Sequence, residues 1–293
     1  MTKQNQLIEL YCAVCYHYDS TLAGEVQRFS NNFRPKFTDE ECLTIYLFGI
    51  AEGKFEVKAV YNFIKDYWHE WFPKLPSYQK FNKRINNLAC AFIRLAELFV
   101  NSKCANPFGM SVTSHIIDSM PIVVASSKRS GSAKAASGLC DKGYCSSKNM
   151  YYYGLKLHIL GEKQYKTLPS PRIMEITKAS TSDLTHAKSM LSQVRDIEIF
   201  ADKIYLDAKW HKELQESGVT IMIPVKLAKA QQLLNSADKL LSAAVARARQ
   251  AIESFNNWIH QKTNIQSASK VRSDNGLIAF VFARIAALVW FNW

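Results

Sequence analysis

The apolar residues in the first third of the chain recur every three or four positions, which is the spacing of amphipathic helices. The clearest stripe consists of Phe81, Ile85, Leu88, Phe92, Leu95 and Phe99. The periodicity predicts helices over residues 2–18, 38–50 and 56–72, and a further helix that Ser77 can cap. Thr38 and Glu41 have the spacing of a capping box at the start of the second helix. We therefore predict a helical N-terminal domain over residues 1–108.

From residue 109 onward, short apolar runs of strand length replace the helical periodicity. Strands are expected over 114–118, 151–160, 171–176, 197–201 and 219–224, and helices over 183–194, 207–217 and 228–262. The long helix has a possible break near Asn235. This order predicts an α/β domain over residues 109–293 with a mixed sheet and flanking helices.

The last 18 residues, from Gly276 to the end, are almost entirely apolar and nearly long enough to span a bilayer. Arg284 stands in the middle of this segment, where a charge is costly in lipid. We therefore expect a C-terminal helix that packs across the sheet. A membrane span is the less favoured alternative.

The formal net charge is +12, from 37 Lys and Arg against 25 Asp and Glu. Residues 1–108 hold 13 basic and 11 acidic side chains, whereas residues 109–293 hold 24 and 14. A basic domain favours a polyanionic partner, most simply nucleic acid, although a protein that is basic only for solubility has the same charge. No secretory signal precedes the first helix and the seven cysteines are scattered, which favours a cytoplasmic protein with reduced thiols.

Two basic segments are candidates for DNA contacts. Residues 123–150 are rich in Ser, Gly and Lys and predict a mobile basic loop suited to phosphate contacts, or a plain flexible linker. Lys80, Lys83 and Arg84 lie near the start of the helix that follows Ser77. That helix could dock on DNA as in helix-turn-helix modules, or these side chains could form an ordinary solvated face.

Two acids follow or end predicted core strands. Asp118 closes the run at 114–118, and Asp202 follows the run at 197–201. Glu253 lies beside the apolar stripe of the long helix, so that packing of this helix on the sheet would bring three carboxylates together. Like charges at one place are tolerated when divalent cations neutralise them, and Mg²⁺ prefers such oxygen ligands. Arg249, one turn before Glu253, could contact a phosphate or only pair with Glu253.

Five segments, taken in order, resemble a known family: IIDSMP, GYCSSKNMYYYGLKLHIL, TKASTSDLTHA, FADKIYLD and RQAIESFNNW. Together they are similar to DDE-type transposases of bacterial insertion sequences, which have a ribonuclease-H-like core. The nine-eighty-two group, allied to the group with a Tyr-Arg-Glu-Lys signature, is the most similar. The resemblance implies that Asp118, Asp202 and Glu253 are the catalytic residues and hold two Mg²⁺ ions, for which Mn²⁺ substitutes.

The resemblance also implies contacts to the ends of the element. The DNA-binding residues expected are Arg249, His260, Lys262, Lys203, Lys128, Arg129 and Lys134. The chain departs from the signature at Ala246, which stands at the Tyr position, and at His260, which stands at the Lys position. Ile204 occupies a place where relatives have Gly after the second acid.

The sequence thus predicts a DNA transposase that hydrolyses a phosphodiester at the element's ends and transfers the freed 3′-hydroxyl to target DNA. A homodimer is expected on DNA, and a nucleoid-associated location when bound. Two alternatives are a nuclease on the same core that lacks strand transfer and an inactive DNA-binding descendant. For the second metal ligand, Asp207 competes with Asp202, but its position favours a helix N-cap.

Overall fold

The computed structural model describes residues 2–26, 35–103, 113–226 and 233–293. By their contacts, the residues form two compact units. The first comprises residues 1–105, 135–138 and 259–293, and the second comprises 106–134 and 139–258. The sequence-based division at residue 108 stays a prediction about functional domains, whereas the contacts group residues 259–293 with the N-terminal helices.

The first unit is helical. Its elements are α1 (Lys3–His17), the short π-helix η1 (Tyr18–Leu22), α2 (Asp39–Ala51), α3 (Val57–Tyr67), α4 (Tyr78–Asn87), α5 (Ala89–Lys103) and α9 (Asp274–Asn292). The predicted capping box is confirmed, since the Glu41 amide donates to Thr38 Oγ1 and the Thr38 amide donates to Glu41 Oε2. The single helix expected after Ser77 is wrong in one respect, because the chain forms two helices that meet at Leu88. The stripe from Phe81 to Phe99 is nevertheless buried throughout, so both helices contribute to one core.

The C-terminal helix α9 is buried, as expected, but it packs mainly on α5, α2 and α4 rather than on a strand. Its apolar residues surround the whole helix, so helices on several sides can cover them. Arg284 is fully buried and donates to the carbonyl oxygens of Thr263, Phe280 and Phe55. Among the described helices, α9 alone is long and apolar enough to cross a bilayer, yet 67% of that stretch is buried inside the protein.

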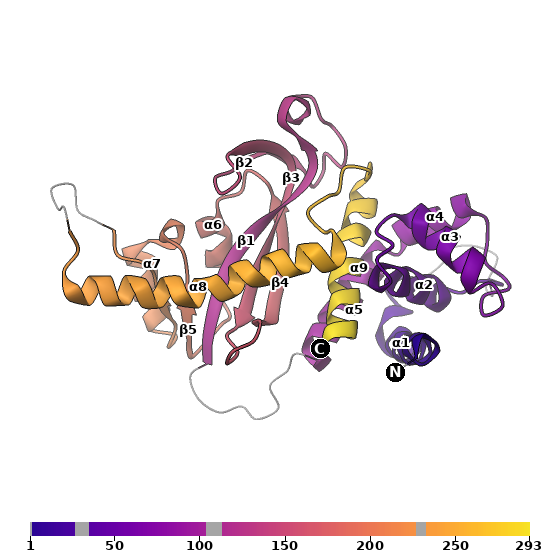
Figure 1. Cartoon of the computed structure of the whole chain (residues 1–293), viewed down its shortest axis with the longest axis horizontal. Coiled ribbons are helices and arrows are strands. Elements are labelled where there is room, and N and C mark those ends of the chain that lie inside the picture. Colours follow the sequence, from indigo (N-terminus) through magenta and orange to yellow (C-terminus); the bar gives the residue numbers. More distant parts are fainter. Residues whose placement is uncertain (1, 27–34, 104–112, 227–232) are drawn as a thin grey trace. The chain divides into compact units, whose positions relative to one another are not determined.

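The second unit is built on one mixed sheet (Figure 1). Its elements in chain order are β1 (Thr113–Ser126), the 3-10 helix η2 (Ser127–Gly131), β2 (Asp141–Cys145), β3 (Met150–Glu162), β4 (Ser170–Lys178), α6 (Asp183–Met190), β5 (Ile197–Phe200), the 3-10 turn η3 (Lys203–Tyr205), α7 (Ala208–Gln215), β6 (Thr220–Met222) and α8 (Ser236–Thr263). The strand order is β2-β3-β1-β5-β6, with β4 also paired to β3. β1 is antiparallel to β3 and parallel to β5, which is parallel to β6. The α/β prediction is confirmed, and the arrangement is consistent with a ribonuclease-H-like core.

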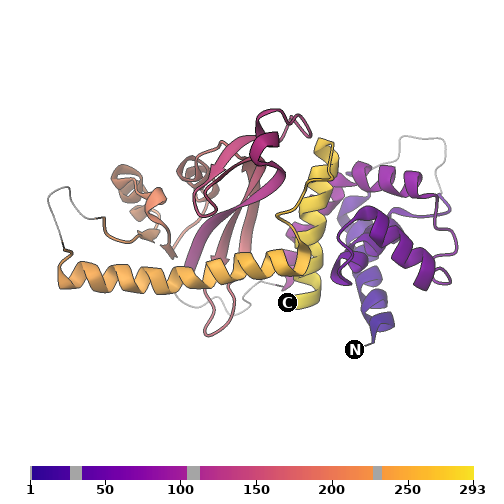
Figure 2. The same cartoon turned by 45° about the horizontal axis from the view of Figure 1, so that its top comes forward.

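Helices cover both faces of this sheet (Figures 1 and 2). Ile117 on β1 packs in a cluster with Ala187 of α6 and Trp210 of α7. Successive side chains of a strand point to opposite faces, so Asp118 points away from that cluster. Asp118 instead meets Asn256 of α8, which runs along the other face of the sheet. This alternation fixes which helix the acid faces.

Two predictions about this unit are wrong. The strand that carries Asp118 does not end there but continues to Ser126 through Pro121. Beyond Ile116, β1 is paired to β3 only, and a proline is tolerated where one edge of a strand has no partner. Residues 123–150 are not a loop throughout, since they contain the end of β1, η2 and β2. In β2, Gly143 and Cys145 face inward while Lys142 and Tyr144 are exposed, an alternation that the Ser- and Lys-rich composition conceals.

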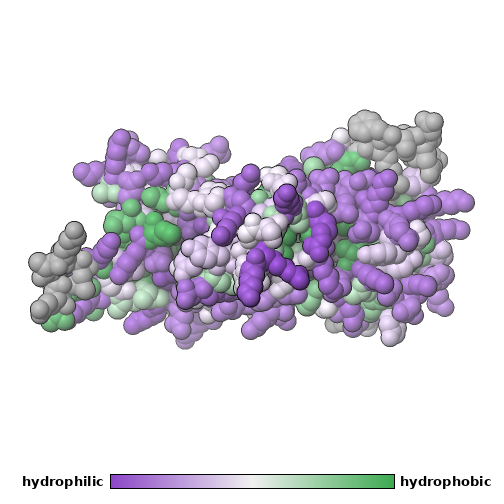
Figure 3. Space-filling view, turned by 90° about the horizontal axis from the view of Figure 1, so that it is seen from above, coloured by the Kyte–Doolittle hydropathy of each residue, from purple (hydrophilic) through white to green (hydrophobic). Residues whose placement is uncertain are grey.

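The face shown in Figure 3 is largely hydrophilic, with scattered hydrophobic patches. The exposed large apolar side chains include Ile204 in η3, Leu206 directly after it, and Leu240 in the first turns of α8.

Candidate active site

Asp118 lies in the central strand of the sheet, between the partners β3 and β5. Its side chain is partly buried, and its Oδ2 accepts a hydrogen bond of 2.9 Å from Asn256 Nδ2 of α8. The pKa of Asp118 is raised to about 6, mainly by burial; the Ser119 amide and Arg249 oppose this rise, and the charges of Asp183 and Glu253 add to it. Asp118 therefore takes up a proton at a higher pH than an ordinary aspartate does.

α8 brings the second and third predicted acids toward Asp118. Arg249 Nη1 lies 3.4 Å from Asp202 Oδ1, and Arg249 Nη2 lies 3.5 Å from Glu253 Oε1. One guanidinium thus bridges the acid after β5 and the acid on α8. The apolar stripe of α8 is buried from Val245 to Ile259, which fixes the orientation of the helix on the sheet.

A family model described as Transposase DDE domain matches residues 108–273, which is more than half of the chain. The chain belongs to this family. A comparison with curated proteins found no match, and a comparison with solved structures found none either. Membership implies a nuclease or transposition enzyme that acts on DNA, and DDE transposases generally use divalent metal ions.

The acids of this DDE domain offer oxygen ligands of the kind that Mg²⁺ prefers. Asn256 adds an amide oxygen, and its Oδ1 is buried without a hydrogen-bond partner among the described residues. An unsatisfied buried oxygen beside a carboxylate fits a cation in this place. Across the described ranges, however, no three His, Cys, Asp or Glu side chains lie close enough to hold one ion, and Arg249 neutralises two of the acids instead. The oxygen atoms of these side chains are chemically suited to a divalent ion. In this structure, however, Asp202 and Glu253 are placed where both pair with Arg249.

Asp207 has a different role in the DDE domain from Asp202. Its Oδ1 accepts from the amides of Lys209 and Trp210, both at 3.1 Å, and its Oδ2 accepts from Lys188 Nζ. These donors lower the pKa of Asp207. The predicted N-cap is therefore confirmed, and Asp207 makes no ion pair with α8 among the described residues.

The structure reveals an acid that the sequence reasoning assigned no role. Asp183, buried at the start of α6, accepts from Ser119 Oγ and Lys156 Nζ, each at 3.0 Å. Burial and the adjacent His186 lower the pKa of His158, which lies beside this pair and stays neutral at physiological pH. Asp183 belongs to the TKASTSDLTHA segment and Asn256 to the RQAIESFNNW segment, both of which carried part of the resemblance. Membership of these segments was the only sign in the sequence that the two residues matter. Their contacts with Ser119 and Asp118 depend on strand pairing and helix packing, which the sequence does not show.

The predicted DNA-binding residues fall into three groups. Arg249 and Lys203 adjoin the acids, and the Lys203 amide donates to Asp202 Oδ1 at 2.7 Å. Lys128, Arg129 and Lys134 are exposed, in η2 and just after it. Ser126 lies eight residues beyond Asp118 on β1, which is roughly 26 Å along a strand, so these three bases are not at the acids.

His260 and Lys262 lie in the last turns of α8, about two turns or more beyond Glu253. They belong to the helical unit by their contacts. Lys262 lines a small pocket there with Gln6 and Glu52. Their contact with DNA stays a prediction.

Proposed function

We propose that the chain is the transposase of an insertion sequence of the nine-eighty-two group. It cuts the phosphodiester at each end of the element and joins the freed 3′-hydroxyl to target DNA. Asp118, Asp202 and Glu253 act as the catalytic carboxylates and hold two Mg²⁺ ions, for which Mn²⁺ substitutes. The observation that carries this proposal is the convergence of β1, the end of β5 and α8, which bring Asn256 to Asp118 and Arg249 to the other two acids.

The side chains have separate tasks in this proposal. The three carboxylates supply oxygen ligands, and Asn256 orients Asp118 through its amide hydrogen. When bound, the divalent ions supply activation of the attacking oxygen and stabilisation of the leaving oxygen. Arg249 shares its charge between Asp202 and Glu253 and so holds these two acids beside each other.

The test uses the purified full-length protein, labelled duplexes from the DNA that flanks the gene, a target plasmid and Mg²⁺. Asp118→Asn, Asp202→Asn and Glu253→Gln should fold, bind the duplex and lose cleavage by about a thousandfold or more, since each replaces an anionic oxygen ligand with a neutral amide. Asp207→Asn is the matched control and should cleave, because Asn also caps a helix. An active Asp202→Asn beside a folded but dead Asp207→Asn would move the second ligand to Asp207.

The same assay separates the alternatives. A transposase gives a joined product between the element end and the plasmid, whereas a ribonuclease-H-like nuclease gives cleavage alone. Binding without cleavage in Mg²⁺ or Mn²⁺ would indicate an inactive descendant. As a readout independent of activity, Mg²⁺ should raise the melting temperature of the wild-type protein more than that of Asp118→Asn.

The remaining parts of the proposal concern assembly and place. Joining two ends requires that two copies meet on DNA, so a homodimer is expected in the DNA complex. A cytoplasmic, nucleoid-associated location follows from a DNA partner. Light scattering with and without the end duplex measures the first point.

A further inference from the structure

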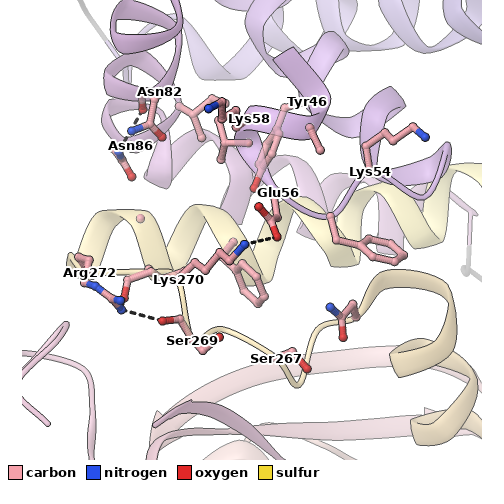
Figure 4. Close-up of a pocket in the computed structure, with 18 of the residues that line it drawn as sticks. Tyr46, Lys54, Glu56, Lys58, Asn82, Asn86, Ser267, Ser269, Lys270 and Arg272 are labelled. Atoms are coloured by element: carbon pink, nitrogen blue, oxygen red, sulfur yellow. Dashed lines mark hydrogen bonds and ion pairs between the residues drawn. The ribbon is translucent and has the colours of Figure 1, made fainter. Parts of the chain in front are cut away.

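The helical unit contains a groove of about 570 Å³ that has no part in the catalytic proposal (Figure 4). Its walls are the turn between α2 and α3, the side of α4, and the connector over residues 264–273 that leads into α9. Tyr78, Asn82 and Asn86 line it from α4 at intervals of four residues, so one face of that helix borders the groove. The turn between α2 and α3 and the connector are the two walls that carry the charges, they are far apart in sequence, and α4 lies between them.

The groove is strongly basic. Its lining includes Lys54, Lys58, Lys270 and Arg272, and one acid, Glu56. Glu56 is paired with Lys270, both side chains being more than half exposed. Lys58 is exposed and makes no ion pair with any residue that the structure describes. Arg272 uses Nη1 to bind the carbonyl oxygens of Ser269 and Val271, which leaves other guanidinium donors for a ligand. Because the lining holds four basic side chains and one acid, it favours an anionic ligand.

The walls are held in place by Arg284. Its Nε donates to the carbonyl of Thr263, directly before the connector, and its Nη2 donates to the carbonyl of Phe55, between Lys54 and Glu56. At the connector's far end, a Cβ on Gly276 would lie 2.7 Å from Asn86 Oδ1, so a larger residue there would displace the Asn86 side chain of α4. A buried arginine that fixes both walls makes the groove a preformed feature of the fold.

We propose that this groove binds the sugar-phosphate backbone of double-stranded DNA, with Lys58 from one wall and Lys270 and Arg272 from the other as phosphate ligands. The inference rests on the proposed function only in that DNA is the substrate. Cations on both walls and a polar helix face between them suit an extended polyanion better than a single phosphate. The DNA site is composite: two of its three ligands lie beyond residue 263, outside the sequence-predicted N-terminal domain.

The test measures the affinity of the full-length protein for a fluorescein-labelled duplex from the DNA that flanks the gene, by anisotropy at several salt concentrations. Lys58→Ala combined with Lys270→Ala should weaken binding about tenfold, since each exposed charge contact contributes up to about 1 kcal/mol. The plot of log affinity against log salt should become less steep by about two. Lys65→Ala combined with Lys74→Ala, exposed lysines of the same unit that do not line the groove, is the matched control and should change little.

Glu56→Gln gives a second, opposite test. It removes the only acid of the groove lining and releases Lys270, so binding should become a few times tighter. If the Glu56–Lys270 pair were purely structural, the variant would leave affinity unchanged or reduce it. Such a result, or equal losses in the groove and control pairs, would overturn the proposal. Displacement of the duplex from the wild-type protein by millimolar inorganic phosphate would likewise overturn it, in favour of a small-anion site.

The outcomes are distinct from those of the catalytic proposal. A wild-type protein that binds the duplex through Lys58 and Lys270 but never cuts it supports the groove and refutes the transposase chemistry. A protein that cuts and joins DNA while its groove pair binds as tightly as the control pair refutes the groove alone. Thermal melts of each variant show whether a loss of binding reflects a loss of folded protein.

Discussion

Two buried charges in different units of this protein are treated in opposite ways. Arg284 in α9 is fully buried, and each of its three nitrogens donates to a backbone carbonyl. Asp118 in β1 has one amide donor from a side chain, a pKa raised to about 6, and neighbours with unsatisfied atoms in Asn256 and Arg249. A buried charge with a complete set of internal partners stabilises the fold, because its desolvation is compensated within the chain. A charge whose surroundings lack partners marks a place where a ligand completes the set.

The largest stability effect is expected at Arg284. Arg284→Met keeps the volume of the side chain but removes three hydrogen bonds and leaves the carbonyl oxygens of Thr263 and Phe55 without this donor. Their desolvation should lower the free energy of unfolding by about 3–5 kcal/mol. Urea denaturation followed by circular dichroism measures this loss, and Arg94→Met, which breaks only an exposed pair with Glu97, is the control. Equal losses in the two variants would show that the buried bonds contribute nothing special.

The sequence predicted the helices and strands better than it predicted which of them pack together. Strict periodicity identified the apolar stripes of α4, α5 and α8, and the capping box placed the start of α2. The composition of residues 123–150 concealed β2, because its inward positions are Gly143 and Cys145 rather than large apolar residues. The neighbours of α9 could not be predicted, since a helix that is apolar all round has no face that selects a sheet or a helix.

The candidate site was predicted in part. The positions of Asp118, Asp202 and Glu253 after or beside core elements suggested that they converge, and the resemblance assigned them roles. Asp183 and Asn256 received no role because their contacts depend on which face of β1 each neighbour covers. Such contacts come from pairing across the sheet and from helix packing, neither of which has a local signal in the sequence.

A smaller effect of opposite sign is expected at Asp118. Burial raises the pKa of its carboxyl from 3.8 to about 6. The proton on Asp118 stabilises the folded protein in full below the pKa of the unfolded state, 3.8. This contribution is lost as the pH rises through the pKa of the folded state, about 6. Asp118→Asn removes the buried charge, so without metal it should be more stable than the wild type by about 1–3 kcal/mol near pH 8 and no more stable near pH 4.

Thermal melts across this pH range, in a chelating buffer, check the prediction. Asp66→Asn, at an exposed acid of α3, is the control, because it removes a carboxylate that is not buried. A stabilisation of the Asp118 variant that persists unchanged at low pH would mean that its origin is packing rather than charge. The charge of Asp118 would then not be destabilising, and the contrast with Arg284 would be wrong.

The smallest stability change separates two residues that both cap a helical turn. Thr38 and Glu41 satisfy each other's backbone amides, and both belong to the helical unit rather than to the candidate active site. Asp202 caps η3 through the Lys203 amide, but its carboxylate is also paired with Arg249 beside the site. Thr38→Ala should therefore reduce the free energy of unfolding by about 1 kcal/mol and leave DNA cleavage intact.

Asp202→Asn should leave stability nearly unchanged, because Asn caps as well as Asp, and should abolish cleavage. Melts and cleavage assays on the two variants measure both quantities. Two results would contradict this prediction: a folded Thr38→Ala that no longer cleaves, or an Asp202→Asn that loses stability but still cleaves. Either would mean that the hydrogen-bond partners of a group do not show whether it is structural or functional in this protein.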